Sequence, residues 1–324
     1  MKKLTYKFIL LVVCLLALSC EKKSKAEEEA QDIMISLDEM RFDQMYYQTA
    51  PQDFPAFRKK FPAFFPKQYS DSVFIAKLTD TLNIELYQEV QKAFPNLKKE
   101  KEDIIKVLQL IKYYFPKKKT PSRLVTLISE VDNENPVIYT DSLCLVALDV
   151  FLGKDHRFYG GFNDYQRQNF EKHQITQNLV KDFATYVVSP PKGRTLLDQM
   201  IFHGKILYLK DLLTPQALDH QKIGYSEEQQ KWCIENEAQM WRYFIDNSLL
   251  YNASADAYYG FIQDGPFSKF NLEIERESPG RVGTWIGWQI VKSFMTNNDE
   301  VPLQKLLEMD AKVVFEKSKY KPRL

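Results

Sequence analysis

Apolar residues recur at helical spacing along most of the chain, and proline residues divide the pattern into short segments. From residue 33 to about residue 115 this predicts a string of helices with prolines at the corners. The prolines are Pro51, Pro55, Pro62, Pro66, Pro95 and Pro116. Helical patterns return later in the chain, so we expect further helices over 175–188, 196–213, 227–251, 285–295 and 303–315.

The pattern changes between residues 123 and 150. Short β-branched or apolar runs at 124–128, 137–139 and 143–150 are separated by turn-forming residues. This spacing predicts a small three-stranded β-meander. Because the chain shows no internal repeat and no low-complexity linker, we expect one helix-dominated α+β domain over 31–324.

Charge and glycine content exclude two classes of protein. The chain carries 44 basic and 43 acidic residues, a formal net charge of +1, which argues against electrostatic binding of nucleic acid. Only 11 of its 324 residues are glycine, and neither GxGxxG nor GxxxxGK[ST] occurs. Composition therefore gives no support for a nucleotide-binding loop or a nucleic-acid partner.

The N-terminus has the features of an export signal. Three lysines precede an apolar run at 8–18 that is too short to span a hydrocarbon core of ~30 Å, so we expect a signal peptide over 1–19. The run ends in Leu-Ala-Leu-Ser-Cys20, which resembles a bacterial lipobox. We therefore predict a lipid on Cys20, with residues 20–30 as a charged, solvated tether. The alternative is an ordinary cleaved signal with an incidental cysteine.

Two further cysteines, Cys144 and Cys233, lie far apart in apolar surroundings. An oxidising periplasm would permit a disulfide between them. We favour two buried free thiols, because neither has a CxxC or catalytic-cysteine context.

A histidine in the predicted helix 196–213 is the first candidate for site chemistry. The order of this helix and a later helix carrying Glu237 resembles the zincin metallopeptidases. Their HExxH motif places two histidines on one helix face to bind zinc, and its glutamate polarises the bound water. Following His203, Gly204 occupies the glutamate position and Leu207 the second histidine position. We therefore predict no catalytic residue and no cofactor, and a partly buried helix histidine at position 203.

Two other segments are well defined in the sequence. Ser226 and Gln229 have the spacing of a capping box, which predicts a helix beginning at residue 227. Near the C-terminus, Gly283 and Gly287 share one helix face and would allow close approach of another element. Tight helix packing is the favoured interpretation, and a ligand site is the alternative.

These segments together resemble the gliding-motility lipoprotein GldB family of Bacteroidetes, over nearly the whole chain. The resemblance is carried by Cys20, the segments 203–208, 223–226, 236–241 and 249–251, and the Gly-Arg-x-Gly-x-Trp-x-Gly-Trp-Gln-Ile-Val stretch at 280–291. It implies a lipid-anchored envelope protein required for gliding. Its partners would be a membrane and other proteins of the gliding and type IX secretion machinery, and its body would face the periplasm.

The resemblance also implies kinship with HExxH zinc peptidases and hence a zincin-like fold. His203 and Glu237 would then stand at the first and third ligand positions as vestiges of a lost zinc site. The strand at 143–150 would be the sheet edge that pairs with a peptide in an active relative. A surviving cleft would bind partners through His203, Lys205, Tyr208, Glu237, Trp241, Arg281, Trp285 and Trp288.

The expected function is therefore partner binding without turnover. Two alternatives remain open at this point. One is an active zinc peptidase with an unusual ligand set, and the other is a lipoprotein that binds peptidoglycan.

Overall fold

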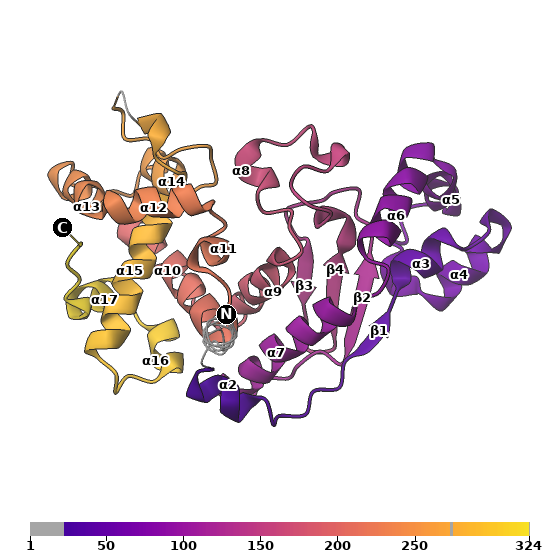
Figure 1. Ribbon diagram of the computed structural model, residues 1–324, viewed down its shortest axis with the longest axis horizontal. Helices are drawn as coiled ribbons and strands as arrows, with labels where there is room; N and C mark the ends of the chain where they lie inside the picture. Colours follow the sequence, from indigo (N-terminus) through magenta and orange to yellow (C-terminus); the bar gives the residue numbers. More distant parts are fainter. Residues whose placement is uncertain (1–22, 273–274, 324) are drawn as a thin grey trace, which may run out of the picture.

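The computed structural model describes residues 23–272 and 275–323. A small sheet and its helices form one half, and a helical half follows in the chain (Figure 1). The helix-dominated α+β class is thus confirmed. The predicted signal peptide and Cys20 lie outside the described residues. Within the described part of the chain, no helix has the length and apolarity needed to cross a bilayer.

The sheet has four strands in the order β1-β2-β4-β3. They are β1 (Asp38–Met40), β2 (Arg123–Leu127), β3 (Val137–Tyr139) and β4 (Leu143–Ala147). Strands β1 and β4 run parallel to β2, and only β3 is antiparallel to its neighbour β4. The predicted meander is therefore wrong, because β2 pairs with β4 and not with β3.

The connection between β2 and β3 shows how this order arises. The backbone N–H groups of Ser129 and Val131 donate to the carboxylate of Asp149, at 2.9 and 2.6 Å. Asp149 is fully buried just beyond β4, in a 3-10 turn at Leu148–Val150. This contact holds the start of the connection beside the end of β4, and β3 then returns along the far side of β4.

The expectation that residues 143–150 form a sheet edge is also wrong. Strand β4 is interior, and β1 and β3 are the edges of the sheet. The outer side of β3 is closed by α9 (Gln174–Ala184) and the turn after it. The N–H of Tyr139 donates to Asp182, and the Tyr186 hydroxyl donates to the carbonyl of Tyr139. Side chains therefore take the places that an added peptide strand would use.

Helices cover the two sheet faces with different clusters. On one face Leu124, Cys144 and Val146 join the core formed with α7 (Lys98–Tyr114) and α9. On the other, Val125 and Leu145 pack against an aromatic cluster from the N-terminal helices. Those helices are α3 (Phe42–Tyr47), α4 (Phe54–Lys60) and α5 (Asp71–Thr79). Helix α6 (Thr81–Ala93) adds Val90 to the first core, and the short α8 (Asp164–Arg167) precedes α9.

The predicted tether at 20–30 is shorter than expected. Residues Lys25–Ala30 form helix α2, which begins at a capping box made by Ser24 and Glu27. Its Ala30 is buried in the core shared with α7. Within the described residues, the charged run is thus helical from Lys25 onward, and the end of this helix is packed on the body.

The C-terminal half is built around two long helices, α10 (Leu196–Leu213) and α15 (Val282–Asn297). The bounds of α10 agree with the prediction. The smaller helices are α11 (Asp219–Ile223), α12 (Glu227–Glu235), α13 (Glu237–Asp246), α14 (Ala255–Phe261), α16 (Leu303–Glu308) and α17 (Ala311–Ser318). The helix predicted at 227–251 divides at Asn236, and the one at 303–315 divides at residues 309–310.

Two local predictions in the body are confirmed. Ser226 and Gln229 form the capping box that begins α12. Cys144 and Cys233 are both buried free thiols. Burial raises the pKa of Cys144 to about 12, so this thiol stays protonated and unreactive.

Helices α10 and α15 cross with their backbones in contact. A Cβ atom placed on Gly287 would collide with the carbonyl of Met200, and one on Gly204 would collide with the backbone of Gly287 and Trp288. Gly283 similarly faces the backbone of Phe261 on α14. The glycines therefore serve close helix packing, as favoured from the sequence.

We expect Gly287→Ala to destabilise the protein by about 1–3 kcal/mol or more, because the new methyl group must push α10 and α15 apart. Gly161→Ala is the matched control, since a Cβ there meets no atom within 4 Å. It should change the free energy of unfolding by no more than roughly 0.5 kcal/mol. Denaturant unfolding of both variants measures the difference. Equal stabilities would contradict the close crossing.

Candidate functional site

His203 is partly buried on α10, with its ring 5.2 Å from that of Phe202. Burial, together with the positive charges of Arg281 and Lys181, lowers the pKa of His203 to about 4. The imidazole is therefore neutral near pH 7, and its surroundings are basic. Protonation of the ring is therefore disfavoured here.

Glu237 lies in a different environment, at the first residue of α13, and its side chain is 3% exposed. Its Oε1 accepts a hydrogen bond from the Tyr320 hydroxyl at 2.7 Å, and Arg323 Nε lies 4.0 Å from its Oε2. Trp241, one turn further on, packs against the rings of Phe315 and Tyr320. Glu237 and Trp241 thus hold the C-terminal segment against α13.

The two vestigial ligand candidates therefore have separate partners. Across residues 23–272 and 275–323, no three His, Cys, Asp or Glu side chains gather in a group that could hold a metal ion. Gly204 and Leu207, at the two remaining motif positions, are both buried in the helix packing.

The other predicted site residues also make structural contacts. The Lys205 ammonium donates to the carbonyl of Met309 at 2.5 Å, so it fastens the connection between α16 and α17 to α10. Burial lowers the pKa of this amine to about 8. Arg281 pairs with Asp264 at 2.7 Å and has a φ of 60° just before α15. These contacts stabilise the ends of helices and the connections between them.

The aromatic candidates belong to the core of the C-terminal half. Trp285 and Trp288 are 3% and 0% exposed, and Tyr208 packs against the same cluster. The Trp288 indole donates to Asp211 at 2.7 Å. Both tryptophans are therefore packing residues of this core.

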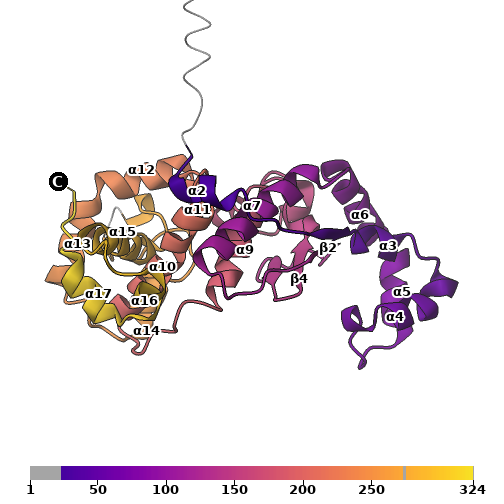
Figure 2. The same ribbon diagram turned by 90° about the horizontal axis from the view of Figure 1, so that it is seen from below.

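A hollow lies elsewhere in the described structure, where the two halves meet. A cavity of about 650 Å³ is bounded by α2, α7, α9 and the connection from α10 to α11. Figure 2 shows α2 beside α7 at this junction. None of the eight predicted site residues lines it. We take this junction cavity as the candidate binding site.

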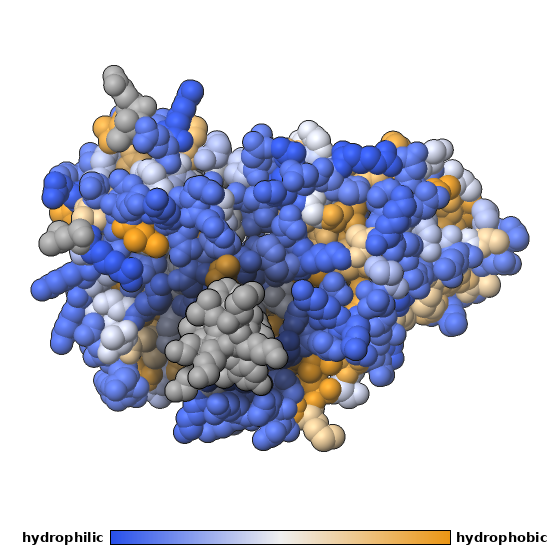
Figure 3. Space-filling view, in the orientation of Figure 1, coloured by the Kyte–Doolittle hydropathy of each residue, from blue (hydrophilic) through white to orange (hydrophobic). Residues whose placement is uncertain are grey.

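The junction cavity is lined by both apolar and polar residues. Its apolar lining residues are Ala30, Val107, Leu110, Ile175, Leu213, Pro215 and Ala217. Its lining also carries both charges, from Lys23, Glu27, Lys99, Glu100, Asp103, Lys106 and Lys172. The surrounding face is largely hydrophilic (Figure 3). Such a cavity suits a ligand with an apolar part and a polar end.

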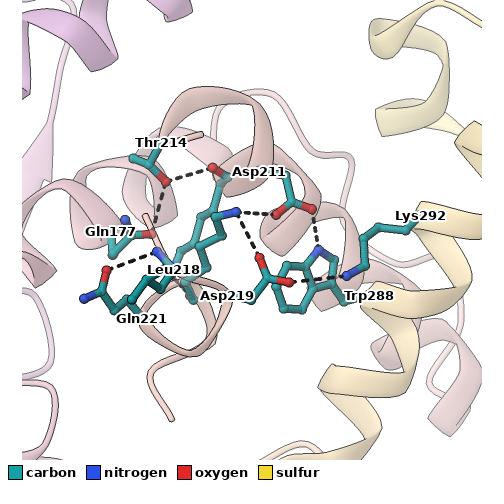
Figure 4. Close-up of polar contacts among 10 residues, drawn as sticks. Gln177, Asp211, Thr214, Leu218, Asp219, Gln221, Trp288 and Lys292 are labelled. Atoms are coloured by element: carbon teal, nitrogen blue, oxygen red, sulfur yellow. Dashed lines mark hydrogen bonds and ion pairs between the residues drawn. The ribbon is translucent and has the colours of Figure 1, made fainter. Parts of the chain in front are cut away.

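A buried polar network supports the wall formed by α10 and α11 (Figure 4). The Lys222 ammonium lies between Asp211 and Asp219, at 2.9 and 3.1 Å. Burial alone would lower the pKa of Lys222, but the two carboxylates raise it, so the amine stays charged. Asp211 also accepts from Trp288, and Lys292 lies 3.8 Å from Asp219. The network therefore ties α10, α11 and α15 together.

The network continues to the lining of the cavity. The Thr214 hydroxyl lies 3.4 Å from Oε1 of Gln177, which is 1% exposed. Gln174 donates to the carbonyl of Gln221 at 2.9 Å, which joins α9 to α11. These amide and hydroxyl groups fix the polar side of the cavity.

Helix α2 forms another wall of the junction cavity. It and the residues just after it are held by hydrogen bonds from Gln216, Tyr113 and Gln109. Gln216 donates to Glu27 at 2.7 Å, and Tyr113 donates to Glu29 at 2.8 Å. Gln109 donates to the carbonyls of Gln31 and Ile33, at 3.1 and 2.9 Å. The first contact spans α2 and the α10–α11 connection, so α2 bridges the two halves at the cavity.

We expect the stability of the protein to rise with pH between about 4 and 6.5 through His203. The unfolded chain, with an ordinary histidine pKa, binds a proton in this window that the folded protein excludes. The effect is bounded at roughly 3 kcal/mol. His203→Gln should flatten this part of the stability curve when urea midpoints are compared. An NMR titration midpoint near 6.5 for the wild-type imidazole would contradict the assignment.

Comparison with known proteins gives one match. Neither the curated proteins nor the solved structures include a match to this chain. The family described as gliding motility protein GldB matches residues 23–322, which include the described helices and strands and the junction cavity. The chain therefore belongs to the gliding motility protein GldB family.

Proposed function

We propose that this protein is a lipid-anchored binding component of the gliding and type IX secretion machinery, with its body in the periplasm. Membership of the GldB family supports a role in gliding and a place in the cell envelope. The lipobox-like sequence ending at Cys20 supports a lipid anchor. On this proposal the protein binds partners and performs no chemistry.

One observation carries the non-catalytic part of the proposal. If the chain descends from a zincin, Gly204 stands where the general base would be, and it is packed against the backbone of Gly287. A glutamate cannot enter this contact without separating α10 from α15. The helix face that would perform hydrolysis is used for packing. A partner-binding role therefore fits this face better than an active peptidase.

We expect cells carrying His203→Gln to glide normally and to hold wild-type amounts of the protein. The reason is that His203, on this proposal, contributes neither a metal ligand nor a base. Colony spreading and immunoblotting measure the two quantities. The metal content of protein purified from the same cells provides a second readout. Loss of gliding at unchanged protein abundance, with stoichiometric zinc in the wild type that the variant lacks, would establish the peptidase alternative.

We expect Cys20→Ala to abolish gliding, because the body would lose its lipid and its place at the membrane. Membrane fractionation and the intact mass of the mature protein check the cause directly.

Crosslinking in wild-type cells should capture other envelope proteins of the gliding machinery. Sedimentation of the purified body with isolated sacculi, without such protein partners, would instead favour the peptidoglycan-binding alternative.

A further inference from the structure

The junction cavity lies next to the point where the predicted lipid is attached. Lys23, Glu27 and Gln31, from α2 and its flanks, all line it. Lys23 is separated from Cys20 by only two residues. Three residues span at most about 10 Å, so a lipid on Cys20 starts within roughly that distance of the cavity wall.

The attachment point cannot move far from the cavity, because α2 is fixed at both ends. Glu27 is bonded to Gln216 on the opposite wall, and Ala30 is buried in the core with α7. Ser24 caps the start of α2 through its contact with the backbone of Glu27. The covalent path from the lipid to the cavity is therefore short and ends on an ordered helix.

The lining of the cavity matches an acyl chain in chemistry and in size. Its lining includes the apolar residues Val107, Leu110, Ile175, Leu213, Pro215 and Ala217, and charged lining residues such as Lys23 and Lys106 are exposed. A volume of about 650 Å³ falls in the range of roughly 300–1,000 Å³ that encloses ligands of this size. An alkyl chain could enter while its ester or amide end stayed among the polar lining groups.

We propose that the junction cavity binds one acyl chain of the protein's own N-terminal lipid. This inference rests on the proposed function, because it requires Cys20 to be lipidated. The chain's own lipid is favoured over a free one, since a short link gives the attached group an effective concentration in the millimolar range. The remaining acyl chains stay in the membrane, so the cavity mouth faces the leaflet.

Photocrosslinking in cells tests the occupant. Benzoylphenylalanine replaces Ala217, which is partly exposed at the cavity, and the matched control carries it at Leu218, which is 54% exposed and does not line the cavity. After irradiation we expect the peptide containing position 217, and not the control, to be joined to the N-terminal lipopeptide. Crosslinks to free phospholipid alone, or no lipid crosslink, would overturn the proposal.

A second measurement does not depend on the photoreactive variant. The complete mature chain from Cys20, made in the cytoplasm without its lipid, should bind a fluorescent palmitate analogue in the emptied cavity. Ala217→Trp should weaken this binding about tenfold or more by filling the mouth, whereas Leu218→Trp should leave it unchanged. Absence of binding by the unmodified chain, or equal binding by both variants, would overturn the proposal.

The intact mass of the protein from cells separates this inference from the proposed function. A mature protein without acyl groups would refute the lipid anchor itself. An acylated protein whose lipid never crosslinks to position 217 would refute only the cavity assignment.

Discussion

The backbone contact between Gly204 and Gly287 is the constraint on which the C-terminal half depends. With these two helices so close, the remaining faces of α10 are free to meet other elements. Lys205 reaches the α16–α17 connection, and Lys210 donates to the carbonyl of Lys222 at the end of α11. Asp211 meets the indole of Trp288. The close crossing of α10 and α15 thus helps set where α11, α16 and α17 attach.

Much of the helical structure could be predicted from the sequence, because its signals are local. The apolar spacing over 196–213 gives α10, and the Ser226 cap gives the start of α12. The strand order could not be predicted in this way. It depends on Asp149 accepting hydrogen bonds from Ser129 and Val131. The spacing of apolar residues in the sequence carries no information about such a contact. Strand β1 has only three residues, two of them acidic, and so gives no strand signal.

The candidate site was harder to predict than the fold, for a related reason. His203 and Glu237 are residue types that a zinc-binding motif uses, and the sequence therefore suggests that they share a site. In the structure each side chain contacts a different set of residues. The junction cavity is assembled from α2, α7, α9 and the segment after α10, which are distant in the sequence. In the sequence, Val107 and Leu110 look like ordinary core residues of a helix. Their place in the lining of the cavity becomes visible only when the two halves of the structure meet.

The chain is helical from Lys25 onward, and this has a mechanical consequence. A flexible leader would stretch before passing any load to the body, but here Gln109 and Tyr113 of α7 grip residues 29–33 directly. Force applied at the N-terminal end of α2 would pass into α7 and on into the core that α7 shares with the sheet. On the proposal that a lipid holds this end at the membrane, the body would respond directly to traction from a surface.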